Sequence, residues 1–202
     1  MVLGFWGNLP GWVLLPGSLS HTVRTVVGNP SLGIKLKYIM GDLIKLADDG
    51  HFDILIHGCN AFCVMGGGFA ASISRRAPHV YHADCQTKKG DRSKMGTYTE
   101  AVVCDTFSVG GYTVINAYTQ YTFWDTSDML DYNALEQVFK AIKDDYDSGD
   151  GIPRIGIPLI GAGLACGDWD EIEAIIKRIG LRNLTIVVFN DVELKKVNRV
   201  IT

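Results

Sequence analysis

The chain has 202 residues, of which 47% are hydrophobic and 20% are charged, and its formal net charge is −3. This length and composition are typical of a soluble globular protein with one large domain, or with one domain and an appendage. The slight negative charge argues against a surface that neutralises many phosphates of duplex nucleic acid, but it is compatible with one phosphorylated small molecule.

Residues 1–33 differ in composition from the rest of the chain. They hold two of the four tryptophans and three of the six prolines, and Arg24 is their one acidic or basic side chain. Prolines and glycines at positions 10, 11, 16 and 17 interrupt the apolar sequence, which excludes a secretory signal and a membrane span. We expect residues 1–33 to be an accessory or non-native extension, with a strand at 22–27, and residues 34–202 to form one domain.

The rest of the chain alternates between strand and helix patterns. Alternating or continuous apolar residues predict strands at 34–40, 53–57, 98–104, 112–118, 154–160 and 185–189. Helical spacing and end signals predict helices at 43–49, 69–77, 79–88, 132–146 and 168–179. This order predicts an α/β fold with a mixed sheet and helices on both of its faces.

The most informative stretch is a buried strand followed by a glycine run. Ile54, Leu55 and Ile56 suit a strand buried on both faces, and His57, Gly58, Cys59 and Asn60 follow at its carboxyl end, where α/β sheets bind ligands. Gly66, Gly67 and Gly68 then precede a helix. A tight turn needs one or two glycines, so three indicate positive φ angles or a ligand lying on the backbone, and a helix N-terminus favours an anion. A Walker A loop is excluded because Phe69 and Ala70 follow Gly68.

A second glycine loop, Gly161-Ala162-Gly163-Leu164-Ala165-Cys166-Gly167, lies between a predicted strand and a helix that Asp168 is expected to cap. With Asp191 after the next strand, it imitates a dinucleotide-binding fingerprint. The glycine spacing is one residue too long, and too few residues follow for the further βα units of that fold.

These motifs, in this order, resemble those of a macro domain, the ADP-ribose-binding module with a three-layer α/β/α fold and a mostly parallel sheet. The resemblance covers about residues 34–200. It depends on Gly41-Asp42-Leu43 after the first strand, His57-Gly58-Cys59-Asn60 with the triple glycine, the segment Pro158 to Leu164, and Val187-Val188-Phe189-Asn190.

The resemblance implies a set of ligand contacts. Asp42, beside Leu43, would accept a hydrogen bond from the adenine amino group, although an acidic residue at a strand end can equally cap a helix. Asn60 would bind hydroxyls of the distal ribose, and Asn190 would contact the ribose next to adenine. Backbone N–H groups of Gly66, Gly67, Gly68, Gly161, Ala162, Gly163, Leu164 and Ala165 would surround the diphosphate.

The segment ILIHGCN followed by GGG resembles the yeast-type ADP-ribose 1''-phosphate phosphatases. The resemblance implies that His57, with Asn60, is catalytic and that neither metal nor cofactor is needed. A histidine beside an anion-binding loop can act as nucleophile or as general acid and base. The alternative is that its ring nitrogens only satisfy backbone groups at the strand end.

Two other functions remain open. Some macro domains hydrolyse ADP-ribose from macromolecules through a lysine and an aspartate. By resemblance, Lys94 takes the lysine position, but Ala165 stands at the aspartate position and also lacks the aromatic ring that many relatives place near the distal ribose. Trp124 and Asp125 could compensate, or they could belong to a solvated loop. A non-catalytic ADP-ribose reader would need only Asp42 and the two glycine loops.

The chain contains five cysteines, which are scattered along the sequence: Cys59, Cys63, Cys85, Cys104 and Cys166. Cys59 and Cys63 lack the second close pair that a zinc site needs, so we expect reduced, mostly buried thiols in a cytoplasmic monomer. The expected partners are ADP-ribose, ADP-ribose 1''-phosphate or an ADP-ribosylated macromolecule, and no membrane.

Overall fold

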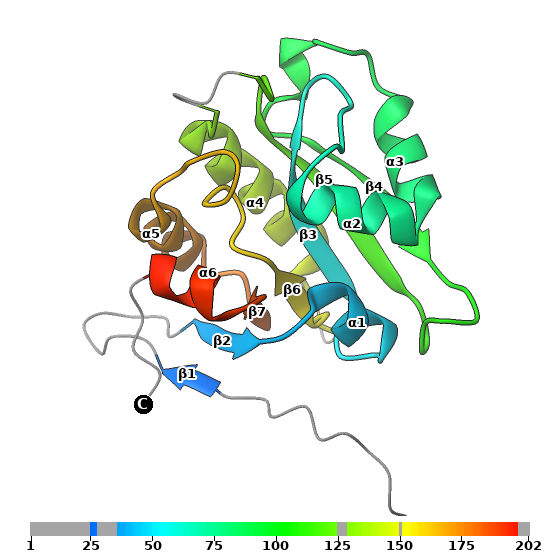
Figure 1. Ribbon diagram of the computed structural model, residues 1–202, viewed down its shortest axis with the longest axis vertical. Coiled ribbons are helices and arrows are strands. Elements are labelled where there is room, and N and C mark those ends of the chain that lie inside the picture. Colours follow the sequence, from blue (N-terminus) through cyan, green and yellow to red (C-terminus); the bar gives the residue numbers. More distant parts are fainter. Residues whose placement is uncertain (1–24, 28–35, 125–128, 150, 198–202) are drawn as a thin grey trace, which may run out of the picture.

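The computed structural model describes residues 25–27, 36–124, 129–149 and 151–197. In this part of the chain, seven strands form one sheet in the order β1-β2-β7-β6-β3-β5-β4 (Figure 1). The strands are β1 Thr25–Val27, β2 Lys37–Met40, β3 Ile54–Asn60, β4 Tyr98–Val103, β5 Tyr112–Gln120, β6 Ile155–Ile157 and β7 Leu184–Val188. The pairs β1·β2 and β4·β5 are antiparallel and the other four are parallel, which confirms the mixed, mostly parallel sheet.

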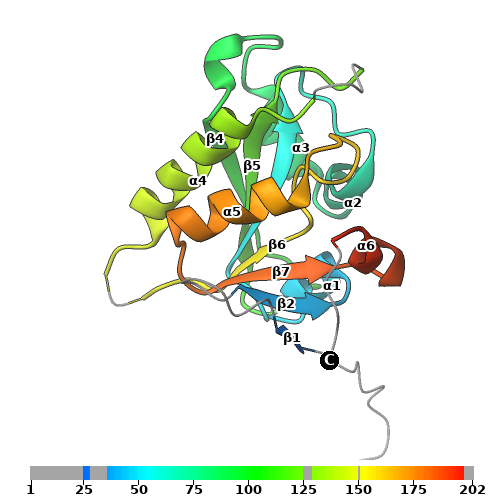
Figure 2. The same cartoon turned by 90° about the vertical axis from the view of Figure 1, so that its left-hand side faces the viewer.

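Helices cover both faces of this sheet and confirm the three-layer α/β/α fold. They are α1 Leu43–Asp48, α2 Gly68–Arg76, α3 Pro78–Cys85, α4 Tyr132–Tyr146, α5 Trp169–Ile179 and α6 Asp191–Lys196, with a 3₁₀ turn, η1, at Arg92–Lys94. Helices α4 and α5 lie on one face, and α1, α2 and α3 lie on the other (Figures 1 and 2). Among the described residues, no helix is long and apolar enough to cross a membrane.

The strand β3 joins the two hydrophobic layers. Its side chains alternate, so Ile54 and Ile56 pack in the cluster that contains Phe139 of α4, whereas Leu55 packs in the cluster that contains Val80 of α3. All three are at most 3% exposed, as the continuous apolar run predicts. The next residue with the parity of Leu55 is His57, which therefore faces α2 and α3.

Several boundaries differ from the sequence prediction. The strand β6 ends at Ile157 rather than at residue 160, because Pro158 has no N–H group to continue the ladder. The helix α6 was not predicted. The strand β1 lies within the predicted extension, yet it pairs with β2, so residues 25–27 belong to the sheet; the other residues of 1–33 lie outside the described part.

The cap of α5 provides a test of helix stability. The side chain of Asp168 accepts a hydrogen bond from Asp170 N at 2.8 Å, which confirms the predicted N-cap. We expect Asp168→Ala to lower the free energy of unfolding by about 1 kcal/mol, because a donor of the first turn loses its partner. Urea denaturation would measure this loss, and Asp168→Asn, which keeps the acceptor, should lose much less. An equal loss in both variants would contradict the capping role.

Candidate ligand-binding site

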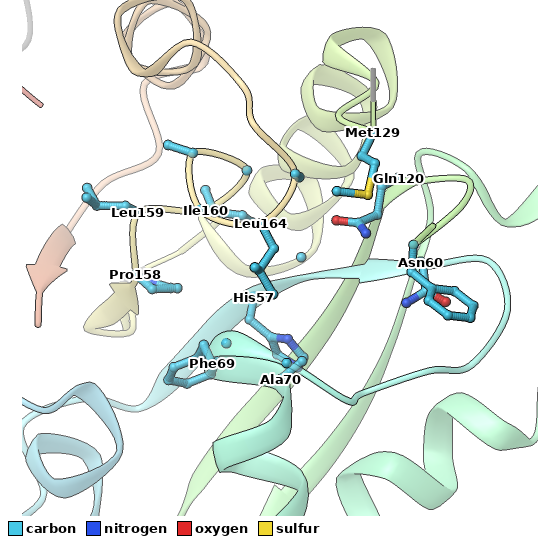
Figure 3. A pocket seen from close by; sticks show the side chains of 18 of the residues that line it. His57, Asn60, Phe69, Ala70, Gln120, Met129, Pro158, Leu159, Ile160 and Leu164 are labelled. Carbon is cyan, nitrogen blue, oxygen red and sulfur yellow. The ribbon is translucent and has the colours of Figure 1, made fainter. Parts of the chain in front are cut away.

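The two predicted glycine loops face each other across one cleft. It has a volume of about 740 Å³ and lies beyond the carboxyl ends of β3, β5 and β6 (Figure 3). Its lining contains every residue of both loops that was expected to bind the diphosphate: Gly66, Gly67, Gly68, Gly161, Ala162, Gly163, Leu164 and Ala165. Two segments that are almost a hundred residues apart in the sequence thus form one concave surface.

Backbone geometry explains the glycines at two positions in these loops. Gly68 and Gly161 have φ angles of 55° and 78°, in the left-handed region that glycine adopts without strain. The N-cap of α2, Gly67, makes no side-chain capping bond, so the first N–H groups of α2 remain available to an anion. The loops also touch, because Leu164 Cδ1 lies 2.7 Å from the position that a Cβ at Gly67 would take.

His57 borders the cleft, but its ring is buried against the layer of α2 and α3. Its Nε2 lies 2.8 Å from Asn116 Oδ1, and its ring centroid lies 5.4 Å from that of Phe69. Because the Asn116 amide nitrogen donates to Val80 O and Thr99 Oγ1, the oxygen of this amide must face His57, which therefore carries its proton on Nε2. Burial lowers the pKa of His57 to about 4, so the ring is neutral at pH 7.

This arrangement bears on the role expected for His57, whose part in catalysis stays a prediction. A side chain that is 1% exposed, uncharged and hydrogen-bonded to Asn116 is poorly placed to attack a phosphate. The geometry instead favours the alternative, in which the ring nitrogens satisfy neighbouring groups. The partners of the ring are the side chain of Asn116 on β5 and, at the strand end, the backbone of Gly58.

Asn60 lines the cleft and also holds its own loop together. Its Nδ2 donates to Val64 O at 2.7 Å, and its Oδ1 accepts from the N–H groups of Phe62 and Val64. One of its two amide hydrogens is not used in these bonds. Asn60 therefore shapes the cleft and keeps one amide hydrogen outside these bonds.

The residues expected around adenine have structural roles in this conformation. Asp42 is the N-cap of α1 and accepts from Ile44 N and Lys45 N, and Asn190 is the N-cap of α6. Leu43 is buried in the core, with Cδ1 2.7 Å from the place of a Cβ at Gly156. None of Asp42, Leu43 and Asn190 is among the described residues that line the cleft. The capping alternative for Asp42 is thus the one that the structure displays.

Lys94 does not reach the cleft. Its Nζ lies 3.5 Å from Asp84 Oδ1, donates to Ala61 O at 3.2 Å and lies 4.2 Å from the ring centroid of Tyr118. The lysine and aspartate arrangement of the hydrolytic macro domains is therefore not assembled here, since Ala165 lines the cleft whereas Lys94 pairs with Asp84 and is not part of the lining. Trp124 packs against Phe62, and Asp125 lies outside the described residues.

Sequence reasoning missed several other residues of the lining, among them Gln120, Phe123, Met129 and Glu193. Gln120 pairs with Asn60 in the β5·β3 register, and Figure 3 shows the two side chains at the same end of the cleft. Of these four residues, only Gln120 could have been predicted from the sequence. It follows a predicted strand, and the carboxyl ends of strands in such sheets bind ligands.

The cysteines were predicted only in part. Cys59 and Cys63 are buried and free, as expected, but Cys85, Cys104 and Cys166 are exposed, so the prediction of mostly buried thiols was wrong. Burial raises the pKa of Cys59 well above its usual range. No group of three or more metal-ligating side chains occurs within the described residues.

Comparison with known proteins identifies the family. Residues 56–176 match the model of the Macro domain, and the chain therefore belongs to the Macro domain family, whose members bind ADP-ribose. An uncharacterized 17.5 kDa protein from the tk-vs intergenic region of Enterobacteria phage T4 is 34% identical, over 70% of this chain and 87% of its own length. An ADP-ribose 1''-phosphate phosphatase of Lodderomyces elongisporus is 22% identical, over 77% of this chain and 99% of its own length.

The fold is also similar to that of solved structures. The structure of Thermosipho africanus DarTG in complex with ADP-ribose superimposes with a TM-score of 0.61 and 18% identity, over 81% of this chain and 46% of that chain. At this identity the similarity establishes the fold alone.

Proposed function

We propose that this protein binds ADP-ribose in the cleft, with the diphosphate between the two glycine loops and the distal ribose toward Asn60 and Gln120. The observation that carries the proposal is the pair of loops lining one cavity, with the N-terminus of α2 left without a side-chain cap. Backbone N–H groups in such loops bind phosphate oxygens. The amides of Asn60 and Gln120 suit the hydroxyls of a sugar.

We further propose that the protein removes the terminal phosphate of ADP-ribose 1''-phosphate. The named relative from Lodderomyces elongisporus, matched over nearly its whole length, supports this reaction. Water would form a bond to phosphorus, the bond from phosphorus to the ribose oxygen would break, and a proton would reach that oxygen. In this proposal His57 is a positioning residue: through Asn116 and Phe69 it fixes β3 and α2, and the loops supply the electrostatic stabilisation.

Removal of ADP-ribose from a macromolecule is the second candidate function. The cleft supports it less well, because Lys94 is paired with Asp84 and an alanine occupies position 165. A non-catalytic reader would need only Asp42 and the two glycine loops. The products distinguish all three: inorganic phosphate from ADP-ribose 1''-phosphate, free ADP-ribose from a modified protein or nucleic acid, or neither.

Gly163 offers a test of the binding site with a matched control. A Cβ at Gly163 would meet nothing within 4 Å, so a larger side chain there can enter the cleft without disturbing the fold. We expect Gly163→Asp to weaken ADP-ribose binding at least about tenfold, because its carboxylate would lie beside the diphosphate. Gly163→Asn has the same shape without the charge and should bind much more tightly than Gly163→Asp. Isothermal titration calorimetry would measure both affinities.

Two results would refute the proposal. The wild-type protein would fail to bind ADP-ribose at millimolar concentration, or the two variants would bind it equally well. Assays of phosphate release and of ADP-ribose release, made with the same preparation, would then decide between the two reactions.

A further inference from the structure

The strand β5 contains an irregularity where it borders the cleft. Its register with β3 is regular up to the pair Cys59 and Tyr118, but the next pair is Asn60 and Gln120, so Thr119 is an extra residue on β5. Such a bulge redirects a side chain, and bulges are frequent beside active sites. Here the bulge lies at the end of the cleft formed by Asn60 and Gln120.

The hydroxyl of Thr119 is buried without a protein partner. The residue is 1% exposed, and its Oγ1 makes no hydrogen bond to the described residues. A buried hydroxyl in this state costs about 1–3 kcal/mol, so an unpaired one is rare and needs an explanation.

The Thr119 hydroxyl lies beside Gly58, a residue of the cleft wall. Thr119 Oγ1 lies 2.9 Å from the position that a Cβ at Gly58 would occupy, and Ile160 Cγ1 lies 3.5 Å from it. Gly58 and Ile160 both line the cleft. A side chain at position 58 would crowd this hydroxyl, whereas glycine leaves room beside it; Thr119 itself is not among the described residues that line the cleft.

We propose that Thr119 is a further ligand-binding residue. Its hydroxyl accepts a hydrogen bond from, or donates one to, an O–H group at the distal-ribose end of the cleft. This inference rests on the proposed function and adds a subsite to it. The O–H group is either a hydroxyl of the distal ribose or a water molecule held by that sugar. Gln120 forms the adjoining wall, and its Nε2 donates to Thr122 O at 3.2 Å, which fixes the orientation of the amide.

The test compares Thr119→Val with Thr119→Ser and uses ADP-ribose and ADP as probes. Valine has the shape of threonine without the hydroxyl, and ADP lacks the distal ribose. We expect Thr119→Val to retain or raise the Tm of the free protein, since it removes an unpaired polar group. Its Kd for ADP-ribose should rise about three- to tenfold, its Kd for ADP should not change, and Thr119→Ser should restore most of the affinity.

Each other outcome overturns the inference. An unchanged Kd for ADP-ribose means that the ligand does not use the hydroxyl, and equal weakening for ADP places the contact elsewhere. A large fall in the Tm of free Thr119→Val means that the hydroxyl already has a structural partner. Failure of the wild-type protein to bind ADP-ribose would instead refute the proposed function itself.

To distinguish the two O–H sources, 2''-deoxy and 3''-deoxy analogues of ADP-ribose can be compared. If one analogue abolishes the difference in Kd between wild type and Thr119→Val, the contact is to that sugar hydroxyl. If neither does, the contact is to the 1''-hydroxyl or is mediated by water.

Discussion

Replacing Lys94 by methionine is expected to lower the free energy of unfolding by about 3–5 kcal/mol, because it leaves a buried carboxylate without its cation. The side chains of Lys94 and Asp84 are only 7% and 1% exposed, and their charged atoms lie 3.5 Å apart. In Lys94→Met the Asp84 side chain would keep the hydrogen bond from Tyr118 OH but lose its countercharge. Chemical denaturation followed by circular dichroism would measure the loss.

Two controls isolate the effect of the buried charge. Lys45 pairs with Asp49 on the surface, where both side chains are more than half exposed, so Lys45→Met should cost less than about 1 kcal/mol. The double variant Lys94→Met, Asp84→Leu removes both charges and should be less destabilised than Lys94→Met alone. A loss in Lys94→Met as small as that in Lys45→Met would contradict the prediction.

The same variant also bears on function. Lys94 donates to Ala61 O, directly after Asn60, so its loss should loosen the loop that shapes the cleft. We expect weaker ADP-ribose binding together with lower stability. If Lys94→Met instead kept its stability and ADP-ribose affinity but lost turnover, Lys94 would be a catalytic residue, and the hydrolase function would replace the phosphatase function.

Most of the fold could be predicted from the sequence because its signals are local. The helix Tyr132–Tyr146 has the bounds that were predicted, since its apolar spacing and the acidic residue before it are both visible in the sequence. The glycine loops were predicted for the same reason. The positive φ angles of Gly68 and Gly161 depend on the backbone of the segment itself.

The roles of side chains were harder to predict because they depend on distant partners. The hydrogen bond from His57 reaches Asn116, 59 residues away, and only the folded sheet brings the two strands together. Asp42 and Asn190 follow strands, but each also precedes a helix, and the sequence cannot decide between a cap and a ligand contact. The position of Thr119 depends on a register shift in strand pairing, for which the sequence carries no local signal.

The burial of His57 should also make the stability of the protein depend on pH between about 4 and 6.5. The pKa of His57 falls from 6.5 in the unfolded chain to about 4 in the folded protein. Between these values the unfolded chain binds a proton that the folded protein does not, so lowering the pH favours unfolding. The contribution of neutral His57 to the free energy of unfolding is fully present above pH 6.5 and is lost as the pH falls to about 4. The total loss is about 3 kcal/mol.

Denaturation at a series of pH values would measure this dependence, and two variants test its origin. His57→Gln removes the titrating group and should flatten the curve between pH 6.5 and 4, whereas His51→Gln changes an exposed ring and should leave the slope as in wild type. Asp105 does not explain this dependence. The Arg76 guanidinium lowers its pKa to about 2, so Asp105 affects stability only at pH values below this range. An unchanged slope in His57→Gln would mean that the ring of His57 takes up a proton in the folded protein at the same pH as in the unfolded chain. It would then be a charged group at the wall of the cleft, and its direct participation in phosphate transfer would become the better hypothesis.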